Sequence, residues 1–180
     1  RPYGAANVLA ADYSAFKLPV ADKFAHAIAM VARERGATMV VAAASTFSKD
    51  ILPRAAAMLD AGMLSDVVEA TRAGDDFVFK RVMFAGNVIA TVQLEGAVKF
   101  LTVRAAAFAQ PAKSASQSPV VNLSFDAAQL PAFAESAGCA AKVAGRPDST
   151  EARIVVSGGR GIKTVEDFER LVGGLADALG

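Results

Sequence analysis

Residues 152–168 read ARIVVSGGRGIKTVEDF, and this stretch decides how the second part of the chain folds. Ile154–Val156 is a β-branched run, which predicts a buried strand. The glycine-rich turn 157–161 follows, and Thr164 stands three residues before Asp167, the spacing that opens a helix. Apolar residues then repeat at helical spacing: Val165, Phe168, Leu171, Val172, Leu175 and Leu179. The stretch therefore predicts a strand, a turn and a helix, as in an α/β domain.

The turn 157–161 lies where open α/β sheets bind ligands, at the carboxyl end of a strand and before a helix. Arg160 places a permanent positive charge there, while Gly159 and Gly161 keep Cβ atoms away from an approaching ligand. The spacing matches neither the dinucleotide-binding G-x-G-x-x-G motif nor the phosphate-binding loop. Because glycines also occur in such turns for steric reasons alone, local chemistry leaves a ligand role and a structural role open.

The first part of the chain alternates between strand and helix patterns. Residues 6–11 and 38–43 read as short buried strands, and a helix follows each of them. We expect Gly36 to end the first helix and the second helix to span residues 49–61. The first helix carries an apolar stripe: Phe24, Ala27, Ile28 and Val31. This alternation predicts a parallel sheet with right-handed crossovers.

From residue 65 the pattern changes to strands with little room for helices. The predicted strands are 66–70, 77–84, 88–94 and 99–104. We interpret Gly86-Asn87 as a tight turn rather than a functional pair. The predicted fold class is therefore α/β, with a Rossmann-like, mostly parallel sheet and an antiparallel extension. Residues 109–120, rich in Ala, Ser, Gln and Pro, are typical of an extended loop.

The loop Ser45–Asp50 is a second candidate site, because it too follows a strand. Four of its side chains could contact a nucleotide phosphate: Ser45, Thr46, Ser48 and Lys49. This makes an adenine-nucleotide-binding domain, or a hydrolase built on one, the alternative function. Against it, the loop has neither a glycine-rich phosphate motif nor a set of carboxylates for magnesium. We expect Ser48 or Asp50 to cap the following helix.

Composition argues against several other classes of protein. The 19 basic and 18 acidic residues give a net charge of +1, so a nucleic-acid footprint and a polybasic membrane anchor are not expected. The longest uncharged runs, 36–48 and 82–94, are too short for a membrane-spanning helix, so we expect no membrane insertion. Cys139 and His26 are the single residues of their kinds, which argues against a metal cluster or an intramolecular disulfide.

Six blocks of the sequence resemble, in order, the alpha subunit of electron transfer flavoproteins. They are STFSKDILPRAAAML (45–59), SDVVEA (65–70), FAGNVIATVQ (84–93), FLTVRAAAF (100–108), GRPDST (145–150) and IVVSGGRGIK (154–163). Several blocks in the family's order are more specific than any one of them. The match covers most of the chain and is poor near residues 110–143.

The resemblance implies two domains and one cofactor. Residues 1–143 would form an N-terminal α/β domain, and 144–180 a linker and the beginning of the FAD-binding domain, so that the chain is an internal fragment of a longer subunit. In this family the arginine of the SGGRG turn lies beside FAD, which assigns cofactor binding to Arg160, Gly159 and Gly161. The resemblance places most of the other FAD-binding residues beyond residue 180. The beta subunit holds AMP, so Lys49 and Arg54 are expected to be structural or at the subunit contact.

The resemblance also implies a function in electron transport rather than catalysis. Such a heterodimer of alpha and beta subunits accepts electrons from acyl-CoA dehydrogenases of fatty acid β-oxidation and related enzymes. It passes them to a membrane quinone oxidoreductase. The blocks resemble mitochondrial and respiratory-bacterial members, so the expected location is the mitochondrial matrix or, alternatively, the bacterial cytoplasm.

Overall fold

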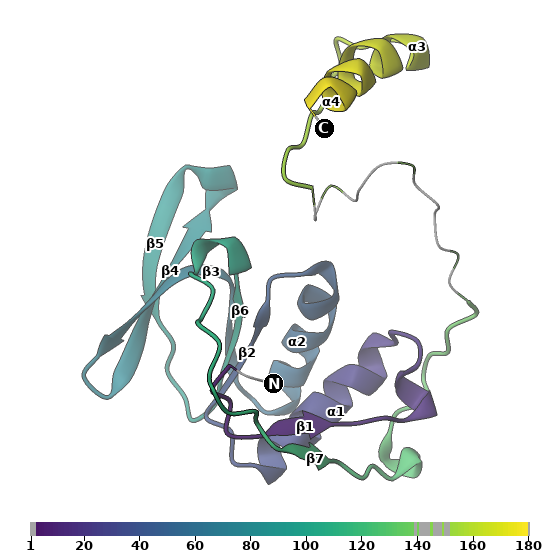
Figure 1. The fold of residues 1–180 in the computed structure, drawn as a ribbon. Helices are drawn as coiled ribbons and strands as arrows, with labels where there is room; N and C mark the ends of the chain where they lie inside the picture. The colour runs from purple at the N-terminus through teal and green to yellow at the C-terminus, as the bar shows by residue number, and fades with distance from the viewer. Residues whose placement is uncertain (1–2, 139, 141–144, 146–148, 150–151, 180) are drawn as a thin grey trace. The chain divides into compact units, whose positions relative to one another are not determined.

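A five-stranded sheet organises the first part of the computed structural model (Figure 1). Its strands lie in the order β2-β6-β3-β4-β5. Their bounds are β2 (Met39–Ala43), β3 (Gly62–Ala73), β4 (Asp76–Met83), β5 (Val88–Gln93) and β6 (Lys99–Val103). The strands β2, β6 and β3 run parallel, whereas β4 and β5 are antiparallel to their neighbours. This arrangement confirms the predicted α/β fold class with its antiparallel extension.

The structure describes residues 3–138, 140, 145, 149 and 152–179. By its internal contacts the chain divides into two compact units, Arg1–Ala137 and Gly138–Gly180. The boundary predicted between residues 143 and 144 lies outside the described residues, as does Cys139. Short 3₁₀ turns connect the larger elements of the first unit: Ser14–Phe16, Phe84–Gly86, Ala105–Ala107 and Ala127–Gln129.

Two helices, α1 (Ala21–Glu34) and α2 (Thr46–Met58), pack on each other and on the parallel strands. Their contact is rich in alanine, which lets two helices approach closely. The buried core between helices and sheet consists of Ala25, Ala29, Ile51, Leu52, Ala55, Ala56 and Phe100. Phe24 and Ile28 of the predicted stripe are half-buried against this core. The apolar face of α1 thus lies close to where the sequence places it.

The ends of the two helices test the capping predictions. Gly36 adopts a φ of 60° directly after α1, which confirms it as the residue that ends the helix. The predicted start of α2 is wrong. The helix begins at Thr46, because the Ser45 hydroxyl accepts a hydrogen bond from the Ser48 backbone N–H at 3.1 Å. The segment predicted as a loop is therefore the first turn of α2, and Pro53 lies inside the helix.

The strand β1 (Val8–Ala10) forms where predicted but does not join the five-stranded sheet. It pairs in parallel with β7 (Val120–Asn122), which begins at the end of the predicted loop 109–120 and continues into a segment for which the sequence predicts no element. Tyr13 fixes the chain beyond β7, since its hydroxyl donates to the Leu123 carbonyl and accepts from the Phe125 N–H. The pairing with β7 supplies backbone hydrogen-bond partners for β1 away from the main sheet.

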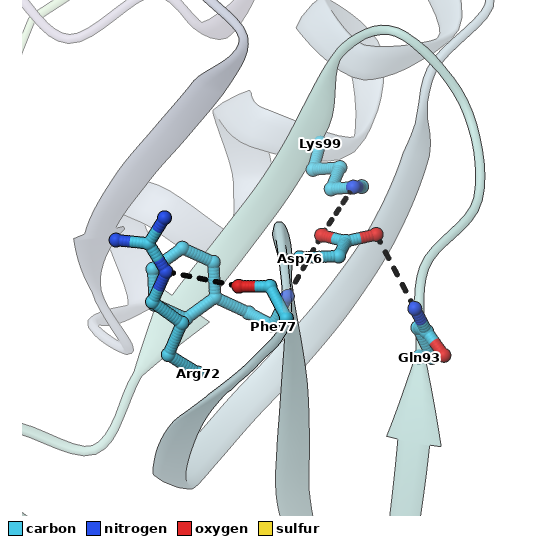
Figure 2. Close-up of polar contacts among 6 residues, drawn as sticks. Arg72, Asp76, Phe77, Gln93 and Lys99 are labelled. Atoms are coloured by element: carbon cyan, nitrogen blue, oxygen red, sulfur yellow. Dashed lines mark hydrogen bonds and ion pairs between the residues drawn. The ribbon is translucent and has the colours of Figure 1, made fainter.

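The antiparallel extension has a core and a polar cluster of its own. Val67, Phe79 and Leu101 are fully buried in it. At the start of β4 the Asp76 carboxylate accepts hydrogen bonds from the Lys99 ammonium at 2.6 Å and the Gln93 amide at 3.3 Å (Figure 2). These contacts join β4 to the end of β5 and the start of β6, and the hydrogen bond from Lys99 is the main cause that lowers the pKa of Asp76.

The regular secondary structure described in the second unit is helical. Its helix comprises α3 (Val165–Phe168), a π-helical turn (Glu169–Gly173) and α4 (Gly174–Leu179). The predicted strand at Ile154–Val156 is wrong: these residues belong to no strand, and Ile154 and Val155 are 58% and 59% exposed. A strand requires a neighbour to hydrogen-bond with, and no strand of the described second unit supplies one.

Candidate functional site

The glycine-rich turn brings the predicted site residues together. The Ile162 N–H donates to the Gly159 carbonyl at 3.1 Å, so Arg160 and Gly161 occupy the two central positions of a β-turn. The Arg160 side chain is exposed and forms no hydrogen bond or ion pair with any described residue. A guanidinium group in this state is available to a ligand or a partner.

The glycines of the turn differ in what demands them. A Cβ atom on Gly158 would lie 2.3 Å from Ile162 Cδ1 and 3.0 Å from Val172 Cγ2, so close packing explains this glycine. A Cβ on Gly159 or Gly161 would meet no heavy atom of the described chain within 4 Å. Neither of these two has a positive φ. Their lack of a side chain thus has no explanation in the described structure, which fits an approach from outside.

Sequence reasoning did not single out Gly158, although it stands in the same run. Its position four residues before Ile162 is the one local feature that points to close packing. The contact with Val172 involves the π-helical turn, and the local sequence pattern does not predict it. Thr164 behaves as predicted: its hydroxyl accepts a hydrogen bond from the Asp167 N–H at 3.1 Å and caps α3. The turn therefore leads directly into a capped helix.

The alternative site, at the start of α2, uses its polar groups internally. The hydroxyl oxygens of Ser45 and Ser48 lie 3.1 Å apart, and Ser48 is only 8% exposed. Phe47 packs edge-to-face on Phe24 of α1. Arg54 forms an ion pair with Asp22 between the two helices, in line with its structural interpretation. Of the candidate phosphate contacts, the Lys49 and Thr46 side chains are exposed.

A third polar group, in the first unit, was not anticipated from the sequence. Arg104, just after β6, donates to Asp66 in β3 through Nε at 3.3 Å and Nη2 at 2.5 Å. This pair holds the pKa of Asp66 below its usual range, with smaller contributions from the charges of Lys49 and Arg81. Residues 66 and 104 are far apart in sequence, so only the pairing of β3 with β6 reveals the pair.

Metal and membrane sites find no support in the described chain. No group of three His, Cys, Asp or Glu side chains there is arranged to hold a metal ion. His26 is half-buried in α1. None of the described helices combines the length and the apolar composition needed to cross a membrane.

Comparison with known proteins places the chain among relatives of one kind. A family model described as the electron transfer flavoprotein domain matches residues 1–128. The chain is 39% identical over 178 residues to the electron transfer flavoprotein subunit alpha of Pseudomonas aeruginosa, covering 98% of this chain and 55% of that protein. It is 33% identical over 180 residues to the mitochondrial subunit alpha of Oryza sativa subsp. indica, covering 97% and 49%.

A probable mitochondrial subunit alpha from Caenorhabditis elegans is 34% identical over 178 residues, covering 98% of this chain and 52% of that protein. The chain thus spans about half the length of the curated relatives it matches. In each case the similarity extends through the glycine-rich turn as well as the five-stranded sheet.

Proposed function

The chain belongs to the electron transfer flavoprotein family, and we propose that it works as part of the alpha subunit of such a carrier. In this proposal residues 1–143 are the N-terminal α/β domain, and residues 144–180 are a linker and the beginning of the FAD-binding domain. The family carries electrons rather than transforming a substrate, so the chain is not assigned a catalytic residue.

The open glycine-rich turn is the observation that carries the proposal. It fits FAD because it presents a guanidinium group that no described residue pairs with, between two glycines whose Cβ positions meet no atom of the described chain within 4 Å. Arg160 would donate hydrogen bonds to the cofactor and favour negative charge on it, whereas Gly159 and Gly161 would let it approach the backbone. FAD, when bound, supplies the electron acceptance and release.

The proposed partners follow from the family. The chain would pair with a beta subunit, receive electrons from acyl-CoA dehydrogenases of fatty acid β-oxidation, and deliver them to a membrane quinone oxidoreductase. Its relatives include proteins named mitochondrial and a bacterial protein, so we place it in the mitochondrial matrix or, alternatively, the bacterial cytoplasm. The adenine-nucleotide alternative gains no support, because Ser45 and Ser48 are engaged with each other.

Purification of the full-length alpha subunit with the beta subunit tests the proposal. We expect the complex to show the visible absorbance of bound flavin, and that absorbance to bleach when an acyl-CoA and its dehydrogenase are added together. Adding the acyl-CoA without the dehydrogenase is the control, and it should leave the flavin oxidised. A complex that forms but never contains flavin would contradict the proposal.

A further inference from the structure

A shallow pocket of about 530 Å³ opens in the first unit, at the carboxyl end of β6. All its lining residues belong to the first unit, whereas the glycine-rich turn belongs to the second. Its lining includes Asp66, Arg81, Phe84, Ala85, Gly86 and Arg104. Two guanidinium groups therefore share this pocket with one carboxylate, which leaves an excess of positive charge.

The ion pair in the pocket leaves donors unused. Arg104 gives Asp66 its Nε and one Nη2 hydrogen bond, and a guanidinium group has five N–H donors in all. The Arg104 side chain remains 46% exposed. Asp66 is held at a φ of 58°, an uncommon conformation for a residue other than glycine, and its N–H donates to the buried Thr102 hydroxyl at 2.9 Å. The fold thus fixes the carboxylate firmly against Arg104.

Arg81 is the second cation, and its charge also acts on Asp66. Its Nε is buried and has no hydrogen-bond acceptor among the described residues. A buried donor without an acceptor is unfavourable, and more so when it belongs to a charged group. Native proteins rarely leave such a group unsatisfied, so an acceptor from outside the chain would explain it.

The rim of the pocket is conformationally unusual as well. Phe84 and Ala85 both have positive φ values, 50° and 54°, and Gly86 follows with 99°. Left-handed backbone is unfavourable for residues other than glycine, and such residues cluster at functional sites. Asn87 holds this turn by donating to the Phe84 carbonyl at 2.7 Å, which agrees with its predicted role in a turn. The Phe84 side chain is 71% exposed beside the arginines.

We propose that this pocket binds a small oxyanion, the phosphate or carboxylate group of a soluble metabolite, through Arg81 and Arg104. Arg81 supplies a second guanidinium group on the wall of the pocket. Asp66 competes with the ligand for Arg104 and so keeps its affinity moderate. The site differs from the Ser45 turn, and it requires no flavin.

Isothermal titration of the purified chain at low ionic strength tests the site, with inorganic phosphate, AMP and succinate as probes. Binding of phosphate and AMP but not succinate would identify a phosphate site, and binding of succinate would identify a carboxylate site; either result supports the proposal. Arg81→Gln should weaken binding at least about tenfold, because a charged hydrogen bond is lost. Asp66→Asn should strengthen it several-fold by releasing Arg104.

Asn tolerates positive φ, so Asp66→Asn keeps the backbone of β3. Arg72→Gln is the matched control. Arg72 lies in β3, the strand of Asp66, and donates through Nε to the Gly74 carbonyl, so its substitution should leave the affinity unchanged. The proposal is overturned if none of the probes binds at about 10 mM, far above the roughly millimolar affinity expected. It is also overturned if Arg81→Gln behaves like Arg72→Gln.

Discussion

Two turns of this chain lead into helices, and they differ in whether their polar side chains are hydrogen-bonded within the described chain. At the start of α2, Ser45 caps the helix and also contacts the buried Ser48 hydroxyl. In the turn before α3, Arg160 is exposed and has no partner in the described chain, and its flanking glycines face open space. The first turn completes a fold, whereas the second presents a charge to its surroundings.

The difference separates two functions that the sequence alone leaves in competition. Hydroxyl groups that are already hydrogen-bonded at the carboxyl end of a strand have less to offer a phosphate. A free guanidinium group beside glycines that no internal contact requires is more consistent with a cofactor. The comparison therefore favours FAD at the turn before α3 over a nucleotide at the start of α2.

Substituting the glycines of the turn should give the largest structural effect. Gly158→Val would press a branched side chain against Ile162 and Val172, and we expect it to destabilise the local packing by about 1–3 kcal/mol. Amide hydrogen exchange across residues 158–173 measures the loss of protection. Gly159→Val is the matched control, since its Cβ meets nothing within 4 Å.

Equal loss of protection in Gly158→Val and Gly159→Val would contradict the distinction drawn between these two glycines. It would mean that packing, and not an external ligand, accounts for all the glycines of the turn. If Gly159→Val instead folds normally but fails to hold flavin in the heterodimer, this result would support a ligand role for Gly159.

Removing the cap of α2 should have a smaller effect. We expect Ser45→Ala to lower the free energy of unfolding by about 1 kcal/mol, because the Ser48 N–H loses its acceptor. Chemical denaturation measures this change, and Thr46→Ala, at an exposed neighbouring position, is the control. If Ser45→Ala instead left stability intact and abolished binding of AMP, the start of α2 would be a ligand site after all.

Acid should reveal the internal polar contacts of the first unit, with the smallest effect. The pKa of Asp76 is lowered in the folded state by Lys99, so this contact stabilises the fold above about pH 4 and is lost as the pH falls further. A circular-dichroism titration should show a shallower acid dependence for Asp76→Asn than for the unsubstituted chain. Identical curves would show that the cluster of Figure 2 contributes nothing to acid stability.

Local pattern predicted the elements of the first unit well, because β2 to β6 and both helices carry clear periodicity and turn residues. It failed where tertiary partners decide. Nothing near residues 120–122 shows that they pair with β1, and the run Ile154–Val156 has strand chemistry but no neighbour in the described structure. The start of α2 was misplaced because Ser45 and Ser48 are both good capping residues.

The candidate sites follow the same rule. Arg160 is proposed from its own sequence neighbourhood and from the family resemblance, since a turn is local. The group formed by Asp66, Arg81 and Arg104 depends on the register of three strands, on left-handed residues that are not glycine, and on a buried donor. None of these features has a local sequence signal.

The most direct test of FAD binding by Arg160 is the flavin affinity of the heterodimer that carries Arg160→Gln. Arg170→Gln is the control, because Arg170 is an exposed arginine of the same unit that pairs with Asp167. We predict that Arg160→Gln weakens FAD binding roughly 5- to 150-fold, the equivalent of about 1–3 kcal/mol, with the fold preserved. If both variants keep the unsubstituted affinity and flavin potential, Arg160 is a solvated turn residue and the assignment of the site is wrong.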